Sequence, residues 1–141
     1  MRAAIDTNVL VSAGFNSHTP PGQIVQAWRQ GAFELVTSRI LLSELEAVLK
    51  RTRIRNRLGW SESEADAVAR GFVVDSIVVE PSSRLAIVRG EADNRVLEAA
   101  VAGEADYIVT GDKDLLDLGS HQSIEIVTPA RFAAILAAEN L

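Results

Sequence analysis

Short apolar runs alternate along the chain with segments whose apolar residues recur at helical spacing. Parallel strands covered by helices on both faces are continuous apolar runs of this kind. The alternation therefore predicts an α/β fold with a five-stranded parallel sheet and helices on both of its faces. The expected strands cover residues 3–5, 33–36, 77–79, 107–109 and 124–127.

Several of the intervening helices carry start signals. Thr37 or Ser38 is placed to cap a helix whose broad apolar face covers residues 40–49. Ser61 and Glu64 have the spacing of a capping box, which opens a helix to about residue 75. The other expected helices cover about 7–14, 20–30, 93–102 and 129 onward, with a turn or single helical turn over 111–116 and a weakly helical or irregular segment over 50–58.

Composition is that of one soluble globular domain over residues 1–141, with 48% hydrophobic and 23% charged residues. No apolar run approaches the ~18 residues of a membrane span. Asp6 and Asn8 interrupt the first apolar run, so we do not expect a signal peptide. The absence of cysteine excludes disulfide scaffolds, zinc–cysteine sites and thiol catalysis, and it fits a cytoplasmic location.

Acidic residues follow two of the expected strands. Asp6 follows the first strand, Asp112 follows the fourth, and Asp93 opens the helix that leads into the fourth. Ligands of open parallel sheets bind outside the carboxyl ends of the strands, so these acids are candidates for one site. Each has a structural alternative, since Asp6 and Asp93 could be helix caps and Asp112 a turn residue that competes with Asp114 and Asp117.

Glu44 is a further candidate, in the helix after the second strand. It borders the apolar face of that helix, about 40° from Val48 at ~100° per residue. Glu46 borders the opposite edge of the same face, so periodicity does not choose between the two glutamates.

Several carboxylates in one cleft raise one another's pKa, and a hard divalent cation relieves the repulsion. Mg²⁺ or Mn²⁺ suits carboxylate and water ligands. His18 and His121 are isolated in loop-like stretches and are expected to be solvated. The sequence has no Gly-rich phosphate loop and no Gly-x-Ser-x-Gly motif, which excludes those nucleotide-binding and serine-hydrolase patterns.

Residues 50–57 include five basic residues, in a protein of net charge −5. One interpretation is a solvated helix end, where cations are favoured. The other is a surface that contacts the phosphate backbone of a nucleic acid. No aromatic residue interrupts the basic run, so base stacking is not indicated. The contacting residues in the second interpretation are Arg51, Arg53, Arg55 and Arg57.

Four motifs together resemble the PIN-domain family, in particular its VapC-like toxin ribonucleases of toxin–antitoxin systems. The resemblance extends over essentially the whole chain, and its two most specific blocks are the first and the last. The motifs are Asp6-Thr7-Asn8-Val9-Leu10, Ser43-Glu44-Leu45, the segment 93–100 (DNRVLEAA) and the segment 109–116 (VTGDKDLL).

The resemblance implies a three-layer α/β/α sandwich in which the first and fourth strands are adjacent. It implies metal-dependent RNA cleavage, with Asp6, Asp93 and Asp112 as ligands of Mg²⁺ or Mn²⁺. Glu44, which the motif selects over Glu46, would be a second-site ligand or orient the attacking water. The implied catalytic residues are Asp6, Glu44, Asp93 and Asp112, with Asn8, Thr110 and Asp114 in support.

The implied partners are RNA, a small antitoxin protein that covers or enters the acidic cleft, and a second copy of the chain in a homodimer. One departure concerns residues 90–92 (GEA), where relatives often carry an additional Asp and a Pro before the third acid. One alternative is a degenerate PIN module that binds RNA or protein without cleavage. Another is a phosphatase of the haloacid-dehalogenase type, which needs a second acid where this chain has Asn8.

Overall fold

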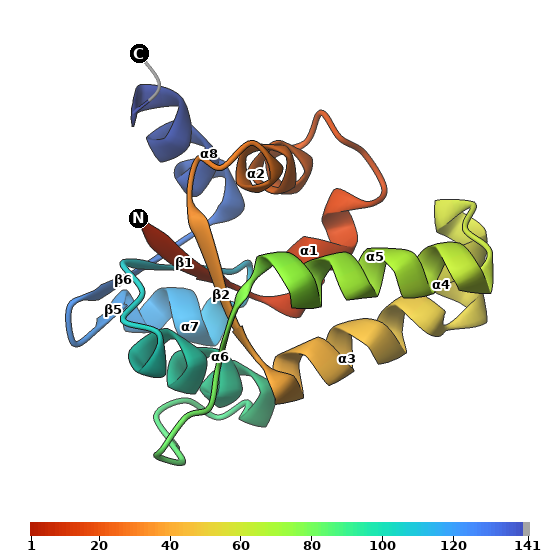
Figure 1. Cartoon of the computed structure of the whole chain (residues 1–141). Helices are drawn as coiled ribbons and strands as arrows, with labels where there is room; N and C mark the ends of the chain where they lie inside the picture. Colours follow the sequence, from red (N-terminus) through yellow and green to blue (C-terminus); the bar gives the residue numbers. More distant parts are fainter. Residues whose placement is uncertain (140–141) are drawn as a thin grey trace.

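A six-stranded sheet forms the centre of the computed structural model, which describes residues 1–139. The strand order is β3-β2-β1-β4-β6-β5, and all neighbours are parallel except β5 and β6 (Figure 1). The parallel part contains the five expected strands, and β1 and β4 are adjacent as the resemblance implies. The sequence prediction missed β5, which is only two residues long. The strands are β1 Arg2–Ile5, β2 Glu34–Ser38, β3 Ile77–Val79, β4 Tyr107–Val109, β5 Ser120–His121 and β6 Ile124–Val127.

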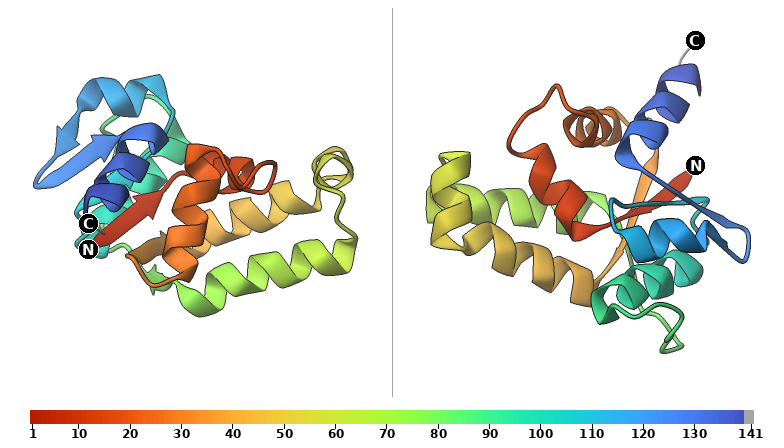
Figure 2. Two further views of the ribbon diagram at one scale, coloured as in Figure 1. Left: turned by 90° about the horizontal axis from the view of Figure 1, so that it is seen from above. Right: turned by 180° about the vertical axis from the view of Figure 1, so that it is seen from behind.

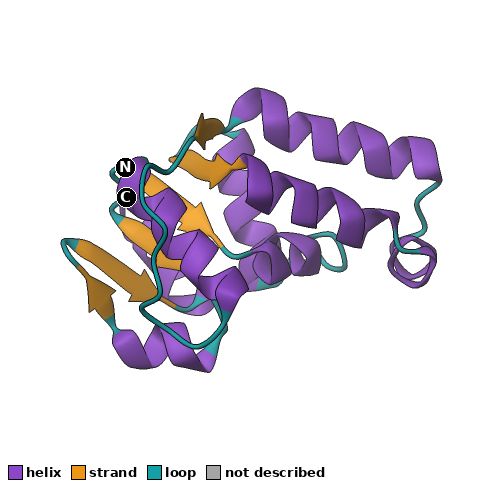
Figure 3. Cartoon of the chain, turned by 90° about the horizontal axis from the view of Figure 1, so that it is seen from below, coloured by secondary structure: helices purple, strands orange, loops and turns teal. Residues whose placement is uncertain are grey.

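Helices cover both faces of this sheet, which confirms the three-layer arrangement (Figure 3). Successive strand residues point to opposite faces. Ala3 and Ile5 therefore pack against α1, α2, α3, α5 and α8, while Ala4 packs against α6 and α7. The helices are α1 Thr7–Ala13, α2 Pro20–Arg29, α3 Arg39–Lys50, α4 Thr52–Leu58, α5 Glu62–Asp75, α6 Glu91–Ala102, α7 Lys113–Leu118 and α8 Pro129–Glu139.

The antiparallel pair α3 and α5 projects away from the sheet, and α4 lies at its far end (Figure 2). Ser38 caps α3, and Ser61 with Glu64 forms the expected capping box of α5. Residues 52–58 form α4, so of the two alternatives for this segment the helical one is correct. Gly59 ends α4 in the left-handed conformation (φ 72°), which glycine adopts without steric cost.

α6 begins at Glu91, two residues before the predicted start, and Gly90 is its N-cap. Its early polar side chains are buried because they bind the irregular segment that precedes the helix. Asn94 Oδ1 accepts from the amides of Ile87 and Val88 at 2.9 and 3.0 Å. Glu98 accepts from the amide of Leu85 at 2.6 Å and pairs with Arg95 at 2.9 Å. Side chains of α6 thus fix the backbone of residues 85–88.

Within residues 1–139, no helix combines the length and the apolar character needed to cross a bilayer.

Candidate functional site

Asp6 and Thr110 lie side by side where the adjacent strands β1 and β4 end. Ile5 pairs with Val109 in the sheet, and the amide of Asp6 donates to the Val109 carbonyl at 3.0 Å. The buried hydroxyl of Thr110 donates to Asp6 Oδ2 at 2.8 Å and accepts from the amide of Asp112 at 3.0 Å. This chain of hydrogen bonds holds the two strand-end acids in a fixed relation. β2 and β3 lie on one side of β1, and β4 and β6 lie on the other side, so the strand order reverses between β1 and β4. Ligands of open parallel sheets bind at such a switch point.

Asp6 and Asp112 are also helix caps. Asp6 Oδ1 accepts from the amide of Asn8 at 3.3 Å, at the start of α1. Asp112 Oδ1 accepts from the amides of Asp114 and Leu115 at 2.9 and 3.3 Å, at the start of α7. The capping alternative is therefore correct for Asp6, whereas Asp112, for which the alternative was a turn residue, is the N-cap of α7. Capping is compatible with a shared site because it fixes the orientation of each carboxylate.

Asp93 is the third residue of α6 and not its cap, so the capping alternative for this residue was wrong. Burial, a hydrogen bond to the Asp112 carboxyl and the charges of Asp112, Asp6 and Asp114 raise the pKa of Asp93 to about 7. The carboxylates of Asp112, Asp6 and Asp114 are therefore close enough to Asp93 to shift its pKa, which groups Asp93 with the strand-end acids. The first turn of α6 thus brings the third acid to the end of the sheet.

Glu44 is half-buried on α3 and faces the same acids. Burial raises its pKa, the charge of Asp6 raises it further, and Arg51 opposes these effects. Glu46 instead forms an ion pair with Lys50 at 2.9 Å on the other side of the helix. The fold thus brings Glu44, rather than Glu46, toward the acid cluster, which periodicity alone did not distinguish.

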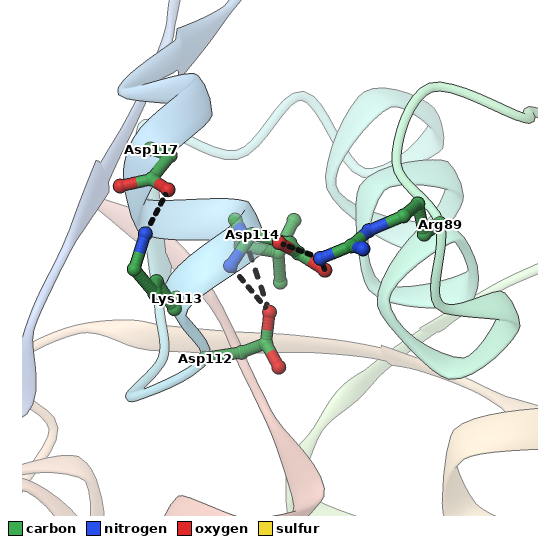
Figure 4. A network of polar contacts seen from close by, with 6 residues as sticks. Arg89, Asp112, Lys113, Asp114 and Asp117 are labelled. Carbon is green, nitrogen blue, oxygen red and sulfur yellow. Dashed lines mark hydrogen bonds and ion pairs between the residues drawn. The ribbon is translucent and has the colours of Figure 1, made fainter.

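Asp114 is bound by Arg89, a residue that the sequence analysis missed. Both Asp114 oxygens accept from Arg89 Nη2, at 3.0 and 3.2 Å. Figure 4 shows this pair on one side of Asp112 and the Lys113–Asp117 pair, 2.7 Å apart, on the other. Arg89 belongs to the irregular segment before α6, where no periodicity marks it, so only the structure identifies it.

A pocket of about 390 Å³ opens beside the strand-end acids. Its polar wall combines two carboxylates with two exposed polar side chains of α1, Asn8 and Ser12. Glu44 and Asp93 are not among its lining residues. The lining residues are Asp6, Asn8, Val9, Ser12, Pro21, Gly111, Asp112 and Pro129.

The donor set of this cluster fits a hard divalent cation bound partly through water. Across residues 1–139, no three or more histidine and acidic side chains already converge closely enough to hold an ion between them. Asp93 interacts most strongly with Asp112 and more weakly with Asp6 and Asp114, and Glu44 interacts with Asp6. Mg²⁺ commonly binds one or two carboxylates and keeps several waters, so this set of acids suits Mg²⁺ or Mn²⁺. Burial is the largest cause of the raised pKa of Asp93, and the neighbouring carboxylates, whose charge such an ion would offset, raise this pKa further.

The basic residues 50–57 do not form a single surface. Arg53 and Arg57 lie on one face of α4, and Arg55 lies on the opposite face at ~100° per residue. Arg55 is half-buried, and its Nε donates to the Lys50 carbonyl at 3.2 Å. The charge of Arg51 lowers the pKa of Glu44. The guanidinium of Arg57 lies over the ring of Phe15, 4.6 Å from its centroid.

Comparisons with known proteins agree with this architecture. Residues 2–114, which include all four acids, match the family described as PIN domain. The chain is 30% identical over 118 residues to the uncharacterized protein MJ1680 of Methanocaldococcus jannaschii, covering 84% of this chain and 75% of that protein. Its fold is similar to a chain in the crystal structure of VapBC2 from Rickettsia felis bound to a DNA fragment from its promoter. That match has a TM-score of 0.59 and 16% identity and covers 91% of this chain and 98% of the other. The chain belongs to the PIN domain family.

Proposed function

We propose that this protein is a divalent-metal-dependent endoribonuclease and the toxin of a toxin–antitoxin pair. The observation that carries the proposal is the cluster of Asp6, Asp93 and Asp112 at the carboxyl ends of β1 and β4. Burial and the neighbouring carboxylates of Asp112, Asp6 and Asp114 raise the pKa of Asp93, and a bound cation would favour its ionised form. Membership of the PIN domain family supports nuclease chemistry for such a cluster.

In this proposal Asp6, Asp93 and Asp112 hold Mg²⁺ or Mn²⁺ directly or through water. The bound ion would lower the pKa of a coordinated water and neutralise charge on the phosphate in the transition state. Glu44 would be a second-site ligand or orient the attacking water, and its raised pKa makes it a better proton acceptor near neutral pH. Thr110 keeps Asp6 in place through their 2.8 Å hydrogen bond.

The remaining polar residues would position the RNA strand. Asn8 lines the pocket beside Asp6, and Asp114 holds Arg89 within reach of the acids. Arg51, Arg53 and Arg57 would contact phosphates, while Arg55 is tied to the Lys50 carbonyl and contributes mainly charge. Each phosphate contact releases counterions, so binding should weaken with added salt.

A small antitoxin and a second copy of the chain are the proposed protein partners, in the cytoplasm. The similar fold of a chain in the VapBC2 complex supports an antitoxin partner. Expression of the chain in a bacterial host should arrest growth. Co-expression of a small protein encoded next to it should restore growth, and Asp6→Asn should do so without any partner.

The decisive experiment is cleavage of mixed RNA by the purified chain with Mn²⁺ or Mg²⁺, with a chelator control. Asp6→Asn and Asp112→Asn should abolish cleavage. Asp117→Asn is the matched control, because Asp117 lies on α7 and, among residues 1–139, forms an ion pair only with Lys113. Cleavage that survives Asp6→Asn would refute the site. Metal and RNA binding without cleavage would instead support the degenerate PIN module.

A further inference from the structure

Two rows of exposed or half-buried side chains lie between the acid cluster and α4. α1 and α3 begin at the carboxyl ends of the adjacent parallel strands β1 and β2 and pack against each other. On α1 and the turn after it, Asn8, Ser12 and Phe15 are spaced by four and three residues and are all exposed. Glu44 lies on α3 and Arg51 directly follows this helix, and the charge of Arg51 lowers the pKa of Glu44, so the two side chains lie near each other.

The far end of the α1 row is an aromatic side chain stacked on an arginine. The Phe15 amide donates to the Ser12 carbonyl at 3.1 Å, so the helical path continues to Phe15. Its ring is 38% exposed, and the guanidinium of Arg57 lies 4.6 Å from the ring centroid. Arg57 is itself exposed at the end of α4. The contact therefore presents an aromatic ring and a planar cation together at the surface.

We infer that Phe15 and Arg57 form a stacking subsite for one base of the single-stranded RNA whose backbone reaches the acid cluster. Unstacked RNA bases bind by stacking on aromatic rings and on arginine planes. Asp6 caps the start of α1 and Phe15 follows its end, nine residues later, which corresponds to roughly 13 Å at ~1.5 Å per residue, a distance that a few nucleotides of a single strand can span. The basic run alone gave no indication of stacking, because the aromatic partner comes from a segment far away in the sequence. This inference rests on the proposed RNA cleavage, because that proposal places one end of the bound strand at the acid cluster.

Charge is distributed in a way that suits this path. The acids gather at the start of α1, where a divalent cation would bring a phosphate. Arg53 and Arg57, which share one exposed face of α4, lie at the other end, where the backbone of the same strand would need neutralising. Arg51 lies between the two ends, close enough to Glu44 to lower its pKa.

The test measures binding of a short single-stranded RNA that carries one 2-aminopurine base, with Ca²⁺ in place of Mg²⁺, so that the intact acids can hold a cation while cleavage is suppressed. Stacking quenches 2-aminopurine fluorescence. Phe15→Leu should weaken binding about 5- to 30-fold and abolish quenching at the labelled position that the parent protein quenches. Phe15→Trp should retain both, which separates loss of stacking from loss of folding, and thermal melting of each variant completes that check.

Arg53→Gln is the matched control for Arg57→Gln. Both changes remove one positive charge from the same face of α4, but only Arg57 lies over an aromatic ring. Both should reduce the salt dependence of binding by about 0.7 in the logarithmic slope. Only Arg57→Gln should also reduce quenching.

Equal quenching in Phe15→Leu and in the parent protein at every labelled position would overturn the subsite, as would failure of the parent protein to bind the RNA. Cleavage by the wild-type protein decides the proposed function separately. Cleavage together with binding that is independent of Phe15 would refute only the subsite. Quenching that depends on Phe15 without any cleavage would refute only the nuclease.

Discussion

Asp93 should destabilise the metal-free protein, and Asp93→Asn should relieve this cost. The pKa of Asp93 rises from 3.8 to about 7 in the folded state, first through burial and then through Asp112, Asp6 and Asp114. A shift of about three units corresponds to at most about 4 kcal/mol at ~1.36 kcal/mol per unit. The side chain is partly exposed, and solvent screening reduces this to about 1–2 kcal/mol.

The sign of the pH dependence follows from the direction of the shift. Because the folded state holds the Asp93 proton more tightly than the unfolded state, its contribution is most favourable below about pH 4. The protein loses this contribution as the pH rises toward about 7. Above that pH the destabilising effect of Asp93 no longer changes. Asparagine carries no such proton, so the wild-type protein should lose stability relative to Asp93→Asn across this range.

The assay is denaturant unfolding of both proteins from pH 4.5 to 8.5 in chelator, with Asp117→Asn as the control. Subtracting the two curves removes the titrating groups that do not interact with Asp93, so the difference reports Asp93 together with the carboxylates of Asp112, Asp6 and Asp114 that interact with it. At pH 8, Asp93→Asn should be more stable by about 1–2 kcal/mol, or roughly 3–8 °C in Tm for a chain of this length. Saturating Mg²⁺ should stabilise the wild type more than Asp93→Asn. A difference that does not change with pH would refute the reasoning, as would an equal Mg²⁺ effect on both proteins.

Three further predictions concern the scaffold of the site. Gly103→Ala should destabilise the protein by about 1–3 kcal/mol in denaturant unfolding, because the new Cβ would lie 2.4 Å from Val36 Cγ1. Gly71→Ala has no neighbour within 4 Å and should stabilise α5 by about 0.5–1 kcal/mol, and an equal effect of the two changes would contradict this argument. Thr110→Val should cost about 1–3 kcal/mol, because the Asp6 carboxylate and the Asp112 amide both lose a partner, whereas Thr110→Ser should be nearly neutral.

The parallel strands and the strand-end acids were predictable because both depend on local sequence. Residues 107–109 are an apolar run, and the acids just after β1 and β4 must meet if these strands are neighbours. The start of α6 was misplaced because Gly90 has no side chain to mark it as a cap. The apolar face of α6 was visible in the sequence, but burial of its polar residues was not, since their partners are backbone amides of a separate segment.

Most features of the candidate site that could not be predicted from the sequence depend on contacts between residues far apart along the chain. Glu44 and Glu46 are equivalent on a helical wheel, and only the approach of Asp6 to one of them separates the two. The contact of Arg57 with Phe15 joins α4 to the turn after α1, and neither position is unusual by itself. The ion pair of Arg89 with Asp114 likewise joins two residues that lie on separate segments of the chain.

The binding of residues 85–88 by α6 has a consequence for the dynamics of the site. The amides of Leu85, Ile87 and Val88 donate to Glu98 and Asn94, so their protons can exchange with solvent only when those contacts open. This irregular segment therefore behaves as part of the cooperative unit of α6 rather than as a freely fluctuating loop. Asp93 directly precedes Asn94 in the sequence, so local opening of this unit would displace the third acid, and exchange rates at these amides would report how often the cluster comes apart.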